Sequence, residues 1–196
     1  MSDEELIGPK VPYLSVIGAL MYLASHTRPD ISFVVNLLAR YSSSPIKRHW
    51  NSVKHIFGTF KELDMGLYCP YVSGAEFIGY ADAGYLSEPQ NGRSQMGYVF
   101  KYDGQVISWR SMKQTFISTS TNHLEIITIH EASRECVWLK SIMHHIREPC
   151  GLSVNKNSPT ILYEDNSVCI AQLKEGHIKS DRTKHISPNL FFTHDL

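Results

Sequence analysis

The sequence has 196 residues, enough for one ordinary domain or for one domain with a small helical addition. Hydrophobic residues make up 42% and charged residues 19%, which excludes wholesale disorder and allows a packed core. Lys plus Arg and Asp plus Glu both number 19, and this balance is not that of a strong nucleic-acid binder, which is usually basic overall.

Up to about residue 63 the sequence predicts helices. Two short segments with apolar residues at helical spacing lie on either side of Arg28-Pro29-Asp30. A third predicted helix has an apolar side formed by Trp50, Val53, Ile56, Phe57, Phe60 and Leu63. Its other side carries Lys47, Arg48, Lys54 and Lys61. This stretch is the most basic in the chain; it indicates either a nucleic-acid-facing helix or an ordinary solvated face, and sequence alone favours the solvated face.

From residue 77 the pattern changes to strands. Phe77–Ala81 is a short apolar run that stops at Asp82. Two β-rich runs, Met96–Tyr102 and Gln105–Trp109, are separated by Asp103-Gly104, a strong hairpin signal. The sequence therefore predicts one strand followed by a hairpin.

A long helix is predicted next, capped near residues 118–121 and continuing to about Ile142. Thr160–Tyr163 then reads as a fourth strand, again followed by acidic residues, and Val168–Lys174 as a second, shorter helix. This order is typical of an α/β fold in which the fourth strand pairs through a crossover connection.

Three carboxylates stand at chemically informative positions in this order. Asp82 follows the first predicted strand, Asp165 (preceded by Glu164) follows the fourth, and Glu125 lies in the first turns of the long helix. Taken singly, such residues are most often turn formers, helix caps or solvated side chains. If the first and fourth strands are neighbours, however, the three carboxylates converge, and they then need a cation between them. Hard oxygen ligands suit Mg²⁺ or Mn²⁺, the ions of phosphoryl-transfer sites.

Ordered motifs along almost the whole chain from about Val11 resemble copia-type retrotransposon Pol polyproteins. The segments that resemble the helical end of a reverse transcriptase are Gly18–Ala24, Thr27–Phe33 and His49-Trp50. Those that resemble the RNase H domain that follows it are Gly79–Ala83, Gly97–Phe100, Ile107–Trp109, Glu164–Asn166 and Arg182–Ile186. The resemblance implies an RNase H-like mixed β-sheet with flanking helices, preceded by a small helical subdomain. The corresponding domains are residues 1–68 and 69–196.

By the same resemblance, the activity is metal-dependent hydrolysis of the RNA strand of RNA–DNA hybrids during retrotransposon replication. Asp82, Glu125 and Asp165 then correspond to the catalytic, metal-binding carboxylates, with Mg²⁺ or Mn²⁺ as the cofactor. Thr121 and Asn122 stand where the family contacts the hybrid, and Asn166 lies beside Asp165, although helix capping explains these small polar residues at least as well. Arg182 and Lys184 are further candidates for nucleic-acid binding. His177 and His185 flank a basic loop, where a solvated histidine is the commoner case.

The sequence also departs from the family pattern. Ser120–Ile126 keeps Glu125 but differs from the family's usual surroundings of this residue, and Ser187 stands where an Asp is common. The family's last strand and helix, with a fourth active-site Asp, are expected beyond Leu196, and Asp195 is a poor substitute. We therefore expect impaired hydrolysis, or, as the alternative, a non-catalytic remnant that acts as a nucleic-acid-binding or protein-interaction module.

The sequence also predicts the absence of a signal peptide, a membrane helix and a zinc site. The acidic start Met1–Glu5 argues against a signal peptide, and no apolar run approaches the roughly 18 residues of a membrane helix. The four cysteines are widely spread and contain no C-x-x-C pair, which favours a reduced, intracellular protein without a zinc site. An RNA–DNA hybrid is the expected partner, with no membrane and no small-molecule cofactor.

Overall fold

The computed structural model describes residues 5–8, 10–62, 67, 76–88, 93–114, 120–151 and 160–175. The chain divides into two compact units, the first comprising Met1–Tyr71 with Trp109–Lys113 and the second Val72–Ser108 with Gln114–Leu196. The predicted domain boundary between residues 68 and 69 lies outside the described residues and stays a prediction. No helix within the described part of the chain combines the length and apolarity needed to cross a lipid bilayer.

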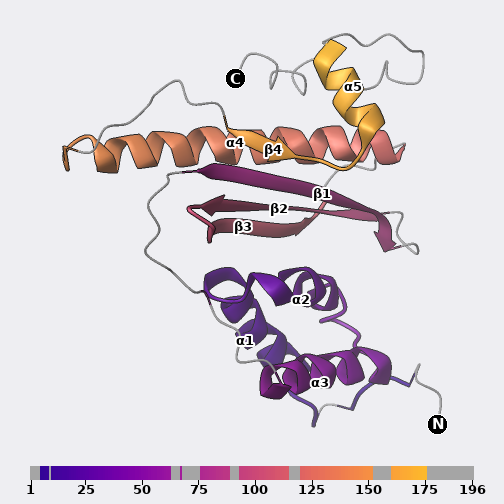
Figure 1. Cartoon of the computed structure of the whole chain (residues 1–196). Coiled ribbons are helices and arrows are strands. Elements are labelled where there is room, and N and C mark those ends of the chain that lie inside the picture. The colour runs from indigo at the N-terminus through magenta and orange to yellow at the C-terminus, as the bar shows by residue number, and fades with distance from the viewer. Residues whose placement is uncertain are drawn as a thin grey trace. The chain divides into compact units, whose positions relative to one another are not determined.

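The first unit contains a group of helices (Figure 1). They are α1 (Tyr13–His26), the short 3₁₀ helix η1 (Pro29–Ile31), α2 (Ser32–Ala39) and α3 (Lys47–Glu62). The Arg28-Pro29-Asp30 interruption is the turn between α1 and α2, where Arg28 donates two hydrogen bonds to the Asp30 carboxylate at 2.8 and 2.6 Å. An isolated antiparallel β-bridge joins Leu6 to Ile46, ahead of α3.

The core of this unit is built from one side of each helix. Its buried members are Tyr13, Ile17, Leu20, Ala24, Ile31, Val35, Leu38, Val53 and Ile56. The Tyr13 hydroxyl donates a hydrogen bond to the Leu38 carbonyl at 2.9 Å, and burial raises the pKa of Tyr13 to about 12. The predicted apolar side of α3 is correct for Val53 and Ile56 but wrong for Phe57, which is 43% exposed. Consecutive helical residues point about 100° apart, so Ile56 and Phe57 cannot both face the core centrally.

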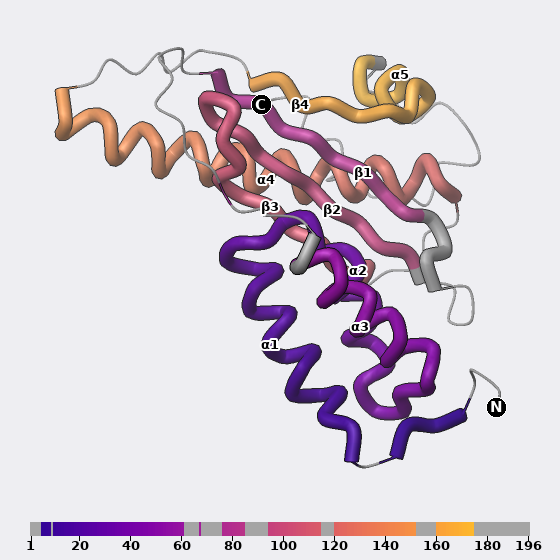
Figure 2. Tube along the Cα trace, turned by 60° about the horizontal axis from the view of Figure 1, so that its bottom comes forward, coloured from indigo at the N-terminus to yellow at the C-terminus, as the bar shows by residue number. Residues whose placement is uncertain are grey.

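The second unit contains a four-stranded mixed sheet in the order β3-β2-β1-β4. The strands are β1 (Phe77–Glu88), β2 (Arg93–Tyr102), β3 (Gln105–Lys113), whose last five residues group with the first unit, and β4 (Ile161–Tyr163). β1 pairs antiparallel with β2 and parallel with β4, and Figure 2 shows β1 between these two strands. The predicted crossover connection and the neighbouring positions of the first and fourth strands are confirmed.

The strand limits differ from those predicted. β1 does not stop at Asp82 but continues to Glu88, because its backbone remains paired with β2 up to Glu88 and Arg93. β2 begins before Met96 and β3 continues past Trp109 for the same reason, because the paired backbone extends beyond the run of apolar residues. The predicted turn is confirmed, since Asp103 and Gly104 both have positive φ (51° and 76°), as a two-residue type I′ turn requires.

Two helices complete the second unit: α4 (Thr121–Arg147) and α5 (Ser167–Glu175). The core between α4 and the sheet consists of Ala81, Tyr98, Phe100, Ile126, Ile129, Ala132, Leu139 and Cys169. Gly79 lies in β1 at its tightest point, where an added Cβ would be 2.5 Å from Phe100 Cε1 and 2.7 Å from Leu162 Cδ1. A residue with a Cβ at this position would force the side chains of Phe100 and Leu162 to shift. The observed architecture is the RNase H-like mixed sheet with flanking helices that the sequence predicted.

Candidate metal centre

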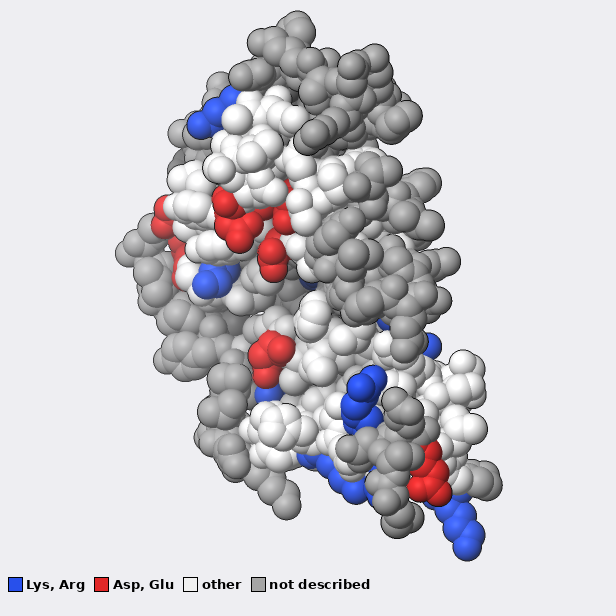
Figure 3. All heavy atoms as spheres, turned by 90° about the vertical axis from the view of Figure 1, so that its right-hand side faces the viewer, with Lys and Arg blue, Asp and Glu red and all other residues white. Residues whose placement is uncertain are grey.

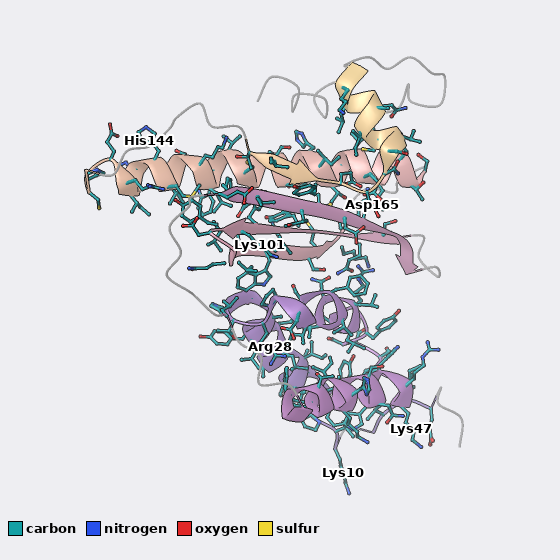
Figure 4. All side chains as sticks on the ribbon, viewed as in Figure 1. Lys10, Arg28, Lys47, Lys101, His144 and Asp165 are labelled. Carbon is teal, nitrogen blue, oxygen red and sulfur yellow. The ribbon has the colours of Figure 1, made fainter. Side chains whose placement is uncertain are left out.

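The pairing of β1 with β4 positions the first two carboxylates. Ile78, Gly79 and Tyr80 lie opposite Ile161, Leu162 and Tyr163 in a parallel register. Extending this register by two residues sets Asp82 beside Asp165. Asp82 lies within β1 and is held by pairing with β2, whereas Asp165 lies just beyond the end of β4, where Figure 4 shows it before α5. Both aspartates are exposed.

The third carboxylate, Glu125, comes from the second turn of α4. This helix begins after Ser120, whose hydroxyl accepts a hydrogen bond from the His123 backbone N–H at 3.2 Å. The N-cap is therefore within the predicted range of residues 118–121, and it fixes the start of the helix. Glu125 is only 7% exposed, and its neighbours Leu124 and Ile126 are also buried. Its burial among apolar side chains is unusual for a residue that carries a charge.

The structure brings the three carboxylates together. One carboxylate oxygen from each of Asp82, Glu125 and Asp165 lies within 4.8 Å of the others. Figure 3 shows a group of neighbouring Asp and Glu side chains on one face of the molecule. Since the predicted convergence is present, a divalent cation with oxygen ligands fits this donor set in charge and chemistry. The roles of Asp82, Glu125 and Asp165 in metal binding and catalysis stay predictions.

Electrostatic repulsion within this group is strong. Burial is the largest cause that raises the pKa of Glu125 to about 8, and the negative charges of Glu164, Asp82 and Asp165 contribute to the same rise. Burial likewise raises the pKa of Glu164 to about 7, against the hydrogen bond that its carboxylate accepts from the Asn166 N–H. No salt bridge between described residues joins any of these four carboxylates to a basic side chain. The excess negative charge is therefore uncompensated within the described part of the chain.

Glu164 is the residue of this site that sequence reasoning did not include. In the sequence Glu164 stands out only as the acidic residue that precedes Asp165. A signal was present, however, because residues alternate between the two faces of a strand. Leu162 packs against the core under α4, so Glu164, two residues later, is directed toward the same helix as Glu125.

Some of the residues predicted to contact nucleic acid lie in the described part of the chain. Thr121 is exposed at the start of α4, and Asn122 donates a hydrogen bond to Gln172 of α5 at 2.7 Å. The Asn166 side-chain oxygen accepts from the backbone N–H groups of Val168 and Cys169, both at 3.1 Å, and so caps α5. These contacts are structural, and contacts with nucleic acid stay predictions. The other predicted residues lie outside the described ones: His177, Arg182, Lys184, His185 and Asp195.

The fold and the site together define a class of protein: an RNase H-like domain with convergent carboxylates at one edge of its sheet. Over 177 residues, 90% of the chain, the sequence is 34% identical to the retrovirus-related Pol polyprotein from transposon TNT 1-94 of Nicotiana tabacum. Over 190 residues it is 29% identical to the Pol polyprotein from transposon RE2 of Arabidopsis thaliana. The chain belongs to the family of copia-type retrotransposon Pol polyproteins.

The matched region is a small part of those relatives, since it spans 13% of the TNT 1-94 polyprotein and 12% of the RE2 polyprotein. A shorter relative is the Secreted RxLR effector protein 161 of Plasmopara viticola, which is 38% identical over 130 residues. This match covers 66% of the chain and 92% of the effector protein. No protein-family model matches the chain.

Proposed function

We propose that this chain is an RNase H-type hydrolase that cleaves the RNA strand of RNA–DNA hybrids with the help of Mg²⁺ or Mn²⁺. The observation that carries the proposal is the convergence of Asp82, Glu125 and Asp165 within 4.8 Å, in a sheet of order β3-β2-β1-β4. Membership of the Pol polyprotein family supports a role in retrotransposon replication.

The donor set suits hard divalent cations. All three ligands are carboxylates, which Mg²⁺ and Mn²⁺ prefer over the imidazole and thiolate ligands of zinc sites. Two of the three side chains are exposed, so a cation and a phosphate group have access from solvent. Glu125 is buried behind them and has one carboxylate oxygen without a hydrogen-bond partner in the described part of the chain. Such an oxygen is costly to bury unless a cation or proton neutralises it.

Each of the three carboxylates in the proposed reaction is held in place by a different element. A bound divalent cation supplies activation of a water molecule and stabilisation of the leaving oxygen. Asp82 is a rigid ligand because the backbone on one side of it is paired with β2. Glu125 is fixed by the core residues on either side of it in α4. Asp165 lies between β4 and the Asn166 cap of α5, so the cap restricts its backbone.

Recognition of the hybrid requires groups beside the carboxylates. Thr121 is exposed at the start of α4 and is a candidate for contact with a ribose 2′-hydroxyl. Backbone phosphates need cations, and Arg182 and Lys184 are the sequence candidates for this role. With a net charge of zero, hybrid binding by the chain is expected to be modest and to weaken as salt increases.

The test is cleavage of a hybrid whose RNA strand is end-labelled, in Mg²⁺ and in Mn²⁺, with single-stranded and double-stranded RNA as comparison substrates. Asp82→Asn should abolish cleavage, because an amide is a poor ligand for either ion. Asp103→Asn is the matched control: Asp103 lies in the hairpin turn, where Asn also accepts positive φ. Equal cleavage by wild type and Asp82→Asn would refute the proposed active site.

A second candidate is a binding module without catalytic activity. One relative, matched over 92% of its own length, is named as a secreted effector protein rather than as a polyprotein, and this name prompts a function other than hydrolysis in retrotransposon replication. A binding measurement on the same hybrid, made beside the cleavage assay, separates the two functions. If wild type binds the hybrid without cleaving it, and Asp82→Asn binds equally well, the chain acts through binding alone.

A further inference from the structure

Two exposed tyrosines lie beside the candidate metal centre, on one face of the sheet. Tyr80 precedes Asp82 by two residues in β1. Tyr163, the last residue of β4, precedes Asp165 by two residues. All four side chains are exposed, and the residue between each pair is buried or half-buried, so the alternation of the strands continues through both aspartates. Because alternate residues of a strand point to the same side, each tyrosine shares a face with its aspartate.

The two tyrosine rings are part of a row that crosses three strands. Tyr80 lies opposite Tyr163 in the parallel register, with ring centroids 5.3 Å apart and ring planes at 19°. From β2, Nζ of Lys101 (labelled in Figure 4) lies 5.3 Å from the centroid of the Tyr80 ring, a cation–π distance. Since β2 and β4 flank β1 on opposite sides, Lys101 and Tyr163 approach Tyr80 from opposite sides. We call Lys101, Tyr80 and Tyr163 the tyrosine row.

The tyrosine row ends in an accessible ring. Tyr163 is 49% exposed, and its ring is covered by Tyr80 on one side. β4 is the outermost strand of the sheet within the described part of the chain, so the accessible side of Tyr163 is the one away from Tyr80. Ile161, on the same face of β4, is 47% exposed and adds apolar surface. Exposed aromatic rings next to a cation are typical stacking surfaces for nucleobases.

We infer that the tyrosine row is a binding site for an unpaired nucleobase, which stacks on the outer side of Tyr163. The inference rests on the proposed function for its substrate and specifies that substrate further. Two strand residues span about 6.6 Å and stacked nucleotides of one strand are about 3.4 Å apart, so the base belongs to a nucleotide about two steps from the bond at the metal centre. Lys101 supplies a positive charge for the phosphates on this face.

The occupant is the single-stranded part of a hybrid junction. A base inside a continuous hybrid is already stacked on both of its sides, whereas a base in a single-stranded extension has a free side for Tyr163. The chain should therefore prefer a hybrid with an unpaired extension to a hybrid with flush ends.

The test compares binding of a flush-ended RNA–DNA hybrid with binding of the same hybrid that carries a short single-stranded DNA extension at one end or the other. The extension contains 2-aminopurine, whose fluorescence is quenched when it stacks on an aromatic ring. The chain carries Asp82→Asn in all binding measurements, so that no hybrid is cleaved. This parent chain should bind one of the extended hybrids about tenfold more tightly than the flush-ended one and quench its 2-aminopurine.

Three variants of Tyr163 in the parent chain test its ring. Tyr163→Ile has no ring but suits a strand, so it should lose the preference and leave binding of the flush-ended hybrid unchanged. Tyr163→Phe should keep the preference. Tyr163→Trp, with a larger ring, should strengthen it, which decides the matter even if Tyr163→Ile does not fold. The matched control is Tyr22→Ala, since Tyr22 is 64% exposed and stacked on His26 of α1, and it should bind like the parent. Urea unfolding checks that each variant is folded.

The outcomes for the base site and for the proposed hydrolysis are separate. A preference that follows the ring at position 163 supports the base site. Equal binding of flush-ended and extended hybrids by the parent, or the same preference in every Tyr163 variant, overturns it, and cleavage by the chain with Asp82 intact then leaves the proposed function standing. A chain that quenches 2-aminopurine through Tyr163 but cleaves no hybrid keeps the base site and refutes the proposed function.

Discussion

Replacing Glu125 with Gln should stabilise the metal-free protein at neutral and alkaline pH. The pKa of Glu125 is raised from 4.5 to about 8 by burial and by the neighbouring charges. A raised carboxyl pKa means that the folded state binds the proton more tightly than the unfolded state does. Stability is therefore unaffected below about pH 4.5 and decreases progressively as the pH rises to about 8. A Gln of nearly the same shape has no proton to lose and stays neutral, so this decrease should be absent.

The size of the effect follows from the shift. Each pKa unit corresponds to about 1.4 kcal/mol, so the full shift sets an upper limit of about 5 kcal/mol. Entry of water and small movements of the side chain lower this value, and we expect a difference on the order of 3 kcal/mol at pH 8. The assay is urea unfolding in EDTA between pH 5 and 8.5, with Glu131→Gln as the control. A difference between wild type and Glu125→Gln that does not grow with pH would refute the reasoning.

Two further predictions concern the framework of the site. Gly79→Ala should lower the free energy of unfolding by about 2–4 kcal/mol, because its Cβ would meet the fully buried Phe100 at 2.5 Å, whereas Gly58→Ala in α3, with nothing within 4 Å, should be neutral or stabilising. Urea unfolding of both variants checks this, and equal effects would contradict it. Asn166→Ala should lower stability by about 1 kcal/mol through loss of the α5 cap, while Asn166→Asp should keep most of it. A thermal melt in which both variants match wild type would exclude the cap.

Much of the fold could be predicted from short-range patterns. Asp103-Gly104 predicted the hairpin because few residue pairs accept two positive φ values in succession. The serine-rich segment before α4 predicted its start because a hydroxyl can cap free N–H groups, and Ser120 does so. The extension of β1 beyond Asp82 was not predictable in this way, since it depends on pairing with β2 and not on the apolar pattern of β1 itself.

The site was predictable only in part, because it depends on contacts between distant residues. Asp82, Glu125 and Asp165 were found from their places at element ends, and the parallel register of β1 and β4 brings the aspartates together. Glu164 was missed, since its burial and its nearness to Glu125 become visible only when α4 is packed on the sheet. For Asn166 the sequence left nucleic-acid contact and helix capping open, and in the structure its side-chain oxygen caps α5.

The most direct test of the central claim is anomalous X-ray scattering from a crystal of the chain soaked in Mn²⁺. The account predicts a strong anomalous peak within bonding distance of the Asp82, Glu125 and Asp165 carboxylates, at about 2.0–2.3 Å from their oxygens. The peak should be absent from a crystal of Asp82→Asn treated identically. A wild-type crystal with Mn²⁺ bound elsewhere and no peak between these three side chains would contradict the account.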